Sequence, residues 1–452
     1  MKESGQRGGL TKRSDKPVSG QVKRRPASAG PTAAVEIAIA KVTPSRMAAF
    51  EILKLVGEGK GHSDELLHSA RVDALSPEDR NLTTALVMGV LRWQIALDAR
   101  VRPLLQRPEQ GLAEPVAIAL RMGAFQLLHL ERIPPHAALS ESVELCRVAG
   151  EPHAAGMVNA VLRKVAGSQK PGVRLYESVA AFAERLAHPR WMVERWAAQY
   201  GRSAALSICE AGQREPAEGG LFAENGGDLP QMDDGSRLVA ELAVTAMPEA
   251  KRVWDCCAAP GGKSLILARR LPSAEVLASD VSARRLAQTK ARLRRYTYAE
   301  RVDLMVADAI EAKGIEGAFD LIVCDVPCSG TGTLARNPEI RQRLGVEDLA
   351  RQAERQRAIL TGALRRLTPG GRLVYSTCSL EPEECENVVD LVLKTGDWRR
   401  VAMGDLLGTL QDRGALLDRA GLGSAVRDGA LRTLPGVHGC DGFFAVILEW
   451  NQ

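Results

Sequence analysis

Two cysteines of this chain stand where a thiol could do chemistry on a bound substrate. Cys328 lies in the segment Asp325-Val326-Pro327-Cys328-Ser329-Gly330-Thr331-Gly332, and Cys378 lies in Ser376-Thr377-Cys378-Ser379. Each follows a hydrophobic run typical of a buried strand. Each also has polar neighbours, unlike a cysteine that serves as a small buried hydrophobe. We therefore predict that both thiols face one cleft.

A proline and two glycines form a predicted turn earlier in the chain. The segment Ala258-Ala259-Pro260-Gly261-Gly262-Lys263 follows a predicted strand, and such a turn lets backbone N–H groups come close to a cofactor. The next three predicted strands end in Asp280, Asp308 and Asp325. One acid alone could equally cap a helix or lie in a solvated loop. Three of them at successive strand ends favour a ligand site, because open α/β sheets bind ligands at the carboxyl ends of their strands.

Two cofactor classes present ribose hydroxyls that an acid after the second strand could bind. Asp280 therefore fits either a nicotinamide dinucleotide or S-adenosylmethionine. The turn carries Pro260-Gly261-Gly262 in place of the pattern Gly-x-Gly-x-x-Gly. The glycine-rich loop that usually binds the pyrophosphate of a dinucleotide is therefore missing. The glycines favour S-adenosylmethionine.

Thiols beside a methyl donor indicate methyl transfer to carbon 5 of cytosine. A thiolate that adds to carbon 6 turns carbon 5 into a nucleophile able to attack a methyl sulfonium. The enzyme also needs an acidic or amide group on the N3/N4 edge of the base and a base for the C5 proton. In the common methyltransferase strand order, the strands before Cys328 and Cys378 are neighbours, so both thiols should face the same pyrimidine. Their spacing does not say which one attacks.

The chain divides into an all-α part and an α/β part. From Thr43-Pro44 onward, apolar residues recur at helical spacing, which predicts a helical bundle over residues 44–167. Residues 168–235 are predicted to form a connector with one helix, Trp191 to Tyr200. Strands alternating with helices then predict a Rossmann-like parallel sheet. The predicted strands are 252–257, 276–280, 302–307, 321–325, 372–377 and 443–448.

Composition restricts the class of protein. A chain of 452 residues is expected to form two or three domains. The sequence shows neither a membrane span nor a secretory signal, and its nine scattered cysteines favour a reducing compartment, so we predict a cytoplasmic protein. The Cys and His residues do not have the spacing of metal ligands, which argues against a zinc site.

Positive charge is concentrated in the amino-terminal tail. Residues 1–30 hold eight basic and two acidic residues, although the net charge of the whole chain is +5. Such a polar tail cannot bury enough apolar surface to fold, so it is predicted to be disordered. It could also act as an arm that attracts RNA.

Five segments of the chain together resemble the Sun/Nop family of RNA cytosine-5 methyltransferases, and within it the bacterial enzymes for small-subunit ribosomal RNA. They are Ala258 to Lys263, Asp325 to Gly332, Asn337-Pro338-Glu339-Ile340, Ser376 to Ser379 with Glu386-Asn387, and Asp441-Gly442-Phe443-Phe444. The helical bundle, with Arg46-Met47-Ala48-Ala49-Phe50 and Gly89-Val90-Leu91-Arg92, looks like a NusB-type RNA-binding domain.

The resemblance implies roles for individual residues. Cys378 would be the nucleophile and Cys328 would assist product release, whereas DNA cytosine-5 methyltransferases attack with the cysteine of a Pro-Cys pair, here Cys328. Asp325 with Lys263 would engage the cytosine edge. Asp280 and Asp308 would hold the ribose and adenine of S-adenosylmethionine. The implied cofactor-binding set is Ala258, Ala259, Pro260, Gly261, Gly262, Lys263, Asp280, Arg285, Asp308 and Asp325.

The expected organisation follows from these observations. We predict a disordered basic arm at 1–42, a NusB-like domain at 43–167, a linker at 168–235 and a methyltransferase domain at 236–452. Family members carry a small RNA-binding subdomain where this chain has only a short stretch, so most of that subdomain is predicted to be missing. Ribosomal RNA is the expected partner and the protein is expected to be a monomer without metal. Methylation of transfer RNA and a non-catalytic role in ribosome assembly remain alternatives.

Overall fold

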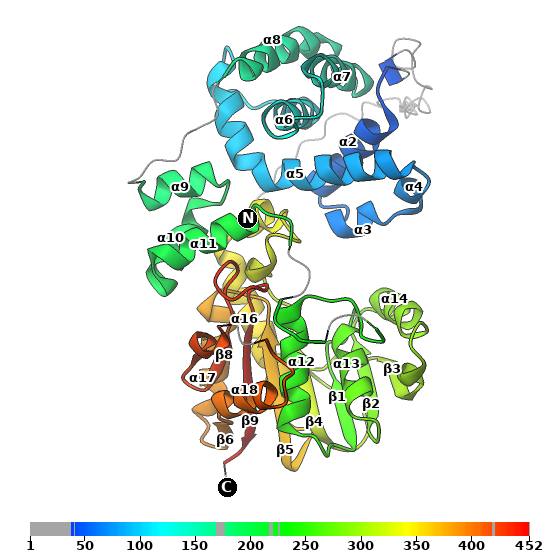
Figure 1. Cartoon of the computed structure of the whole chain (residues 1–452), viewed down its shortest axis with the longest axis vertical. Coiled ribbons are helices and arrows are strands. Elements are labelled where there is room, and N and C mark those ends of the chain that lie inside the picture. Colours follow the sequence, from blue (N-terminus) through cyan, green and yellow to red (C-terminus); the bar gives the residue numbers. More distant parts are fainter. Residues whose placement is uncertain are drawn as a thin grey trace, which may run out of the picture.

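The structure is a computed structural model that describes residues 38–39, 41–168, 177–216, 220–224, 227–417 and 421–451. Figure 1 shows a helical part, in blue to teal, above an α/β part that runs from green to red. The basic arm predicted for residues 1–42 lies almost wholly outside the described residues. Within the described part, no helix combines the length and the apolar character that crossing a membrane requires.

The helical part is a bundle built around one apolar core. Its longest helix begins at Pro77, because the Ser76 hydroxyl accepts a hydrogen bond from the backbone N–H of Asp79 (3.1 Å) and proline fits the first turn. Gly89 allows close packing, since a Cβ there would overlap the ring of Phe125. The helices are α2 (Pro44–Gly57), α3 (Ser63–Leu67), α4 (Ala70–Asp73), α5 (Pro77–Val101), α6 (Glu114–His129), α7 (Pro135–Val148) and α8 (Ala155–Ala166).

The connector is more helical than the sequence predicted. In place of one helix it forms α9 (Val179–Arg185), α10 (Arg190–Tyr200) and α11 (Arg202–Gly212). These helices have a small core of their own around Trp196, which also includes Leu380 of the α/β part. Between Gly212 and Asp234, the described residues form neither a helix nor a regular strand, and only an isolated bridge joins Phe222 to Leu416.

The α/β part is built on one mixed sheet, whose order within the described residues is β3-β2-β1-β4-β5-β9-β8-β7, with β6 paired to β9. The first five strands in that order are parallel, whereas β9 runs antiparallel to β5. The six predicted strands are all present, with slightly different ends; β6, β7 and β8 were not predicted. The strands are β1 (Arg252–Asp255), β2 (Glu275–Asp280), β3 (Val302–Val306), β4 (Phe319–Asp325), β5 (Leu367–Thr377), β6 (Trp398–Arg400), β7 (Val426–Arg427), β8 (Ala430–Arg432) and β9 (Phe444–Trp450).

Helices cover both faces of this sheet. Residues of α12 (Asp234–Ala246), α13 (Gly262–Arg270) and α18 (Met403–Asp412) share one apolar core with one sheet face. Residues of α16 (Val346–Leu364) and α17 (Glu386–Leu393) share a second core with the opposite face. Alternate residues of the strands therefore belong to different cores, for example Ile322 and Val323 of β4.

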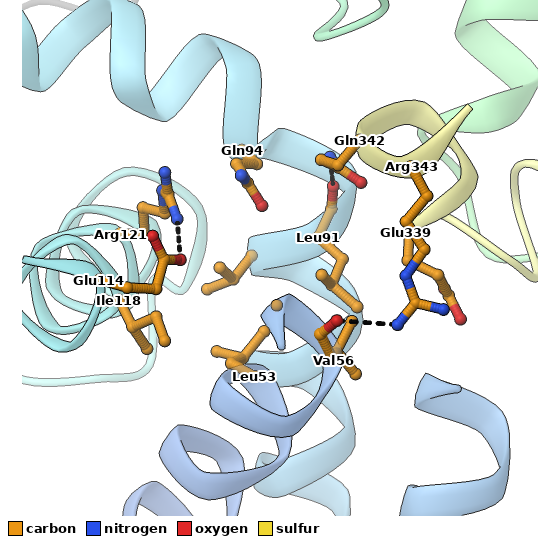
Figure 2. Close-up of a pocket in the computed structure, with 12 residues that line it drawn as sticks. Leu53, Val56, Leu91, Gln94, Glu114, Ile118, Arg121, Glu339, Gln342 and Arg343 are labelled. Carbon is orange, nitrogen blue, oxygen red and sulfur yellow. Dashed lines mark hydrogen bonds and ion pairs between the residues drawn. The ribbon is translucent and has the colours of Figure 1, made fainter. Parts of the chain in front are cut away.

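The two parts are joined next to the segment that follows Cys328. Gln342 donates to the carbonyl oxygen of Leu91 (3.0 Å), and Arg343 donates to that of Val56 (2.8 Å). Figure 2 shows both contacts at the rim of a cavity of about 200 Å³ between the bundle and helix α15 (Ile340–Arg343). The bundle is thus anchored close to the predicted catalytic loops.

Candidate active site at the carboxyl edge of the sheet

The pairing of β4 with β5 brings the two cysteine loops together. Asp325 and Ser376 are partners in the parallel register. The Ser376 hydroxyl donates to Asp325 Oδ1 (2.8 Å), and the backbone N–H of Val326 donates to the carbonyl oxygen of Ser376 (3.0 Å). The chain turns just beyond both partners, so Cys328 and Cys378 leave the sheet at the same edge.

The two thiols are in contact. The Sγ atoms of Cys328 and Cys378 are 3.3 Å apart, and both residues are partly buried. The hydrogen-bonding contact with Cys378, together with burial, raises the pKa of the Cys328 thiol well above its usual value. Cys328 is therefore held as a neutral thiol at neutral pH.

An ammonium–carboxylate pair lies on the same edge. Lys263, near the start of α13, donates from Nζ to Asp325 Oδ2 (2.6 Å) and to Ser236 Oγ (2.6 Å). The ammonium group also lies 5.4 Å from the ring centre of Phe443. Lys263 is buried, while the Asp325 side chain is about one quarter exposed. The carboxylate is thus oriented by one cation and one hydroxyl, and part of it faces outward.

The turn after β1 meets the end of β2. Gly261 adopts a left-handed conformation (φ 92°) at the start of α13, where a Cβ would lie 2.7 Å from Thr289. Asp280 accepts from the backbone N–H of Ala259 (3.3 Å) and from Arg285 Nη1 (3.3 Å). Arg285 also donates to the carbonyl oxygen of Ala259 (2.7 Å), so this arginine fastens the turn to the strand end.

The residues predicted to bind S-adenosylmethionine fit such a group. The turn from Ala258 to Gly262 has no side chain longer than that of proline, and Pro260 is its one exposed residue. Asp280 accepts three hydrogen bonds through its two oxygens, which leaves acceptor capacity for a ribose hydroxyl. Asp308 follows β3, is exposed, and uses Oδ1 to accept from the backbone N–H of Ile310 (2.9 Å). The backbone N–H of Ala307 donates to the carbonyl oxygen of Asp280 (3.2 Å), which brings the two strand ends together.

The remaining cysteines do not join this pair of thiols. Cys256 and Cys324 are buried with their Sγ atoms 3.0 Å apart, and burial raises both pKa values. Cys146 and Cys209 are also buried, whereas Cys257 is only partly so. Among the described residues, no group of three or more His, Cys, Asp or Glu side chains is arranged to hold a metal ion.

Some polar contacts of the site were not predicted from the sequence. Ser236 accepts from Lys263, and Ser376 donates to Asp325. The second contact follows from the register of β4 and β5, in which Asp325 and Ser376 are direct partners. The first depends on how α12 packs and has no local signal. Phe444 lies in the core on β9, and Phe443, which is also buried, packs beside Lys263.

Comparison with known proteins agrees with this architecture. Residues 243–449 match the family described as 16S rRNA methyltransferase RsmB/F, and residues 43–167 match the NusB family. A solved structure titled "Crystal Structure of PH0851" shares the fold, with a TM-score of 0.67 and 20% identity over 90% of this chain and 99% of that one. The predicted NusB-type domain and the Rossmann-like methyltransferase domain are both confirmed.

Relatives match along nearly the full length. Ribosomal RNA small subunit methyltransferase B of Xanthomonas campestris pv. campestris is 32% identical, covering 92% of this chain and 99% of that protein. The probable ribosomal RNA small subunit methyltransferase B of Bacillus subtilis is 30% identical, covering 89% and 98%. The chain therefore belongs to the RsmB/F methyltransferase family, whose cofactor is S-adenosylmethionine.

Proposed function

We propose that this protein methylates carbon 5 of a cytosine in small-subunit ribosomal RNA through a covalent bond between Cys378 and carbon 6. The observation that carries the proposal is the contact of two thiols, 3.3 Å apart, beside the Lys263–Asp325 pair. A methyltransferase acting on a nitrogen or a hydroxyl oxygen needs no thiol. A second thiol has a use only if the first one forms an adduct that must later be broken.

The Cys378 sulfur serves both the first and the last step of this reaction. The Cys378 thiolate adds to carbon 6 and forms the C–S bond, which makes carbon 5 nucleophilic. S-adenosylmethionine would supply an electrophilic methyl group to carbon 5, and the rest of the donor would leave as the neutral thioether S-adenosylhomocysteine. A base then takes the C5 proton, the electron pair of the C5–H bond restores the ring double bond, and the C–S bond breaks with its electron pair returning to the Cys378 sulfur.

Cys328 suits the later step of this division of work. The raised pKa of Cys328 keeps its proton in place at neutral pH, so it is a poor first nucleophile. It touches the sulfur of Cys378 and is therefore close to the C–S bond that must break. We assign Cys328 to product release on this basis.

The Lys263–Asp325 pair supports recognition of the cytosine edge. Asp325 uses Oδ1 to accept from Ser376 and Oδ2 to accept from Lys263, so its orientation is fixed from two sides. A carboxylate held in this way can accept a hydrogen bond from the N4 amine, and the Lys263 ammonium beside it can stabilise negative charge that develops on the ring. Asp280, Asp308 and the turn from Ala258 to Gly262, fastened by Arg285, would hold the methyl donor.

The test uses RNA that contains 5-fluorocytosine, because fluorine at carbon 5 cannot leave as a proton does and the adduct persists. With S-adenosylmethionine present, wild-type protein and Cys328→Ala should form a denaturant-resistant RNA adduct, whereas Cys378→Ala should form none. On ordinary RNA, Cys328→Ala should accumulate adduct that wild type releases. An adduct formed by Cys378→Ala but not by Cys328→Ala would reverse the assignment of the two thiols. No adduct with any variant would overturn the covalent mechanism.

The RNA class rests on the relatives and on the bundle. The named relatives act on ribosomal RNA of the small subunit, and this chain carries the NusB-family domain beside its site. A cytosine in structured RNA must be turned out of its stack to reach such a site. The proposed methylation would take place in the cytoplasm. Bisulfite sequencing of RNA from a strain that lacks the protein should show a lost methylcytosine in small-subunit ribosomal RNA; a loss confined to transfer RNA would refute this choice.

A further inference from the structure

A buried glutamate lies directly behind the two thiols. Glu384 has no exposed surface, and all of the hydrogen bonds found for its carboxyl group come from neutral donors. Oε1 accepts from the backbone N–H of Ser329 (2.8 Å) and from Gln356 Nε2 (3.0 Å). Oε2 accepts from the hydroxyls of Ser329 and Ser379 (2.5 Å for Ser379). Burying a carboxyl group costs free energy, which hydrogen bonds such as these offset.

The donors reveal what the carboxyl group connects. Ser329 directly follows Cys328, and Ser379 directly follows Cys378. The two hydroxyls are also 3.0 Å from each other. One carboxyl group therefore holds the residue after each thiol, although the two loops are otherwise separate segments about 50 positions apart in the chain.

Glu384 is itself fixed in place from two sides. Tyr375 of β5 donates its hydroxyl to the Glu384 carbonyl oxygen (2.7 Å). Gln356 of α16 donates to Pro327, the residue before Cys328, as well as to Glu384 (2.9 Å to the Pro327 carbonyl oxygen). The residues on both sides of Cys328 are therefore held by hydrogen bonds that lead to the Glu384 carboxylate, directly for Ser329 and through Gln356 for Pro327.

We propose that Glu384 is a positioning residue that keeps Cys328 and Cys378 in contact, so that the second thiol can reach the adduct formed by the first. The catalytic meaning of this role rests on the proposed function, but the spacing of the thiols does not. Glu384 touches neither sulfur in its hydrogen bonds and acts through Ser329 and Ser379. Its negative charge also contributes to the raised pKa of Cys328, after the contact with Cys378 and burial.

The spacing of the thiols can be measured without RNA or methyl donor. Diamide, an azo compound, takes two electrons and two protons from a pair of thiols and leaves a disulfide. Its rate of joining Cys328 to Cys378, followed by mass spectrometry of the linked peptides, reports whether the two sulfurs meet. Glu384→Ala should slow this rate at least about tenfold, because displacements near 1 Å have effects of up to about a hundredfold on reactions between held groups. Glu384→Gln keeps the length and the acceptor oxygen, so it should restore most of the wild-type rate.

The rates of methyl transfer should rank the variants in the same order as the rates of cross-linking. Glu384→Ala should reduce turnover at least about tenfold and should accumulate adduct on ordinary RNA as Cys328→Ala does, while Glu384→Gln should recover much of the turnover. Glu383→Ala is the matched control, because Glu383 is the adjacent acid but is partly exposed and pairs with Arg195 of α10 (2.6 Å). It should cross-link and turn over as wild type does.

Two results would overturn the proposal: cross-linking of Glu384→Ala at the wild-type rate, or equal slowing by Glu383→Ala. If Glu384→Ala does not fold, Ser329→Ala and Ser379→Ala remain, since each removes one hydroxyl from the carboxyl group. Each should then slow cross-linking, and wild-type rates in both would overturn the proposal equally. If the methylated base is not cytosine, only the predictions on turnover fail. The predictions on cross-linking still hold, because cross-linking depends on neither RNA nor cofactor.

Discussion

Asp255, the last residue of β1, carries its carboxyl group into the interior behind the cofactor turn. Oδ2 accepts from the Ser264 hydroxyl (2.6 Å), and Oδ1 has no hydrogen-bond partner among the described residues. Burial raises the pKa of Asp255 to about 6. The residue therefore stabilises the fold when it is neutral, and its ionisation opposes folding.

This carboxyl group gives the protein a pH-dependent stability. The folded-state pKa is above the unfolded value, so the contribution of Asp255 is complete below about pH 4 and is lost as the pH rises through about 6. Asp255→Asn removes the titration. The free energy of unfolding of the variant minus that of wild type should therefore increase by about 2 kcal/mol between pH 4 and pH 7. Chemical denaturation at several pH values measures this difference, and a difference independent of pH would contradict the prediction.

Individual residues of the site differ in how well the sequence reveals them. Cys328 and Cys378 follow strands that a hydrophobic run marks clearly, so their meeting could be predicted from strand order alone. Glu383 and Glu384 are adjacent and identical in type, and no local pattern says that one is partly exposed and the other is buried behind the thiols. That difference arises from how α16 and β5 enclose the loop, which only the folded chain shows.

At the scale of elements, Gly332 is where three loops touch. Its backbone N–H donates to the carbonyl oxygen of Cys378 (2.9 Å), and its carbonyl oxygen accepts from the backbone N–H of Gly442 (2.8 Å). A Cβ at this position would overlap the Gly442 carbonyl oxygen and would lie 2.8 Å from that of Cys378. Both obstacles are backbone atoms, so the loops would have to move apart.

Gly332→Ala should therefore damage the site more than the fold. We expect at least about a tenfold loss of methyl transfer, because the Cys378 loop is displaced from the Cys328 loop. Binding of S-adenosylmethionine, measured by calorimetry, should persist, since the turn after β1 is not involved. Gly408→Ala in α18 is the control: a Cβ there meets nothing within 4 Å, and alanine stabilises a helix by up to about 1 kcal/mol relative to glycine. Full activity in Gly332→Ala would show that the three loops do not need this contact.

Elements with a long periodic pattern were predicted, and short ones were not. The bundle helices and the six principal strands carry repeats of apolar residues, or buried runs, over several positions. Strands β6, β7 and β8 have only two or three residues each, too few for any periodicity, and they exist because β9 and its neighbours supply pairing partners. Helices α9 and α11 were missed because their apolar residues pack into a small core shared with Leu334, Leu380 and Leu434, more than a hundred residues away.

At the scale of the whole molecule, the bundle and the α/β part are joined through buried polar contacts. Glu339 is buried and accepts from the backbone N–H of Ser63 (3.1 Å) and from its hydroxyl (2.8 Å), across 276 positions of the chain. Arg92 of α5 donates to the carbonyl oxygen of Ala335 (2.8 Å), which lies between Glu339 and the Cys328 loop. The bundle thus holds the segment that leads out of the catalytic site. A NusB-type domain attached in this way would present RNA in a fixed orientation to the thiols.

Glu339→Ala should loosen this junction while leaving the sheet intact. The substitution leaves two buried donors of Ser63 without acceptors, at about 1–3 kcal/mol for each. Hydrogen exchange should therefore accelerate in α3 and α15, with no change in β4 and β5, where the ladder is independent of the bundle. Glu65→Ala is the matched control, because Glu65 pairs with Arg284 across the same junction but both side chains are exposed, and exposed pairs contribute little. Wild-type exchange in Glu339→Ala, or equal acceleration in Glu65→Ala, would mean that other contacts hold the two parts together.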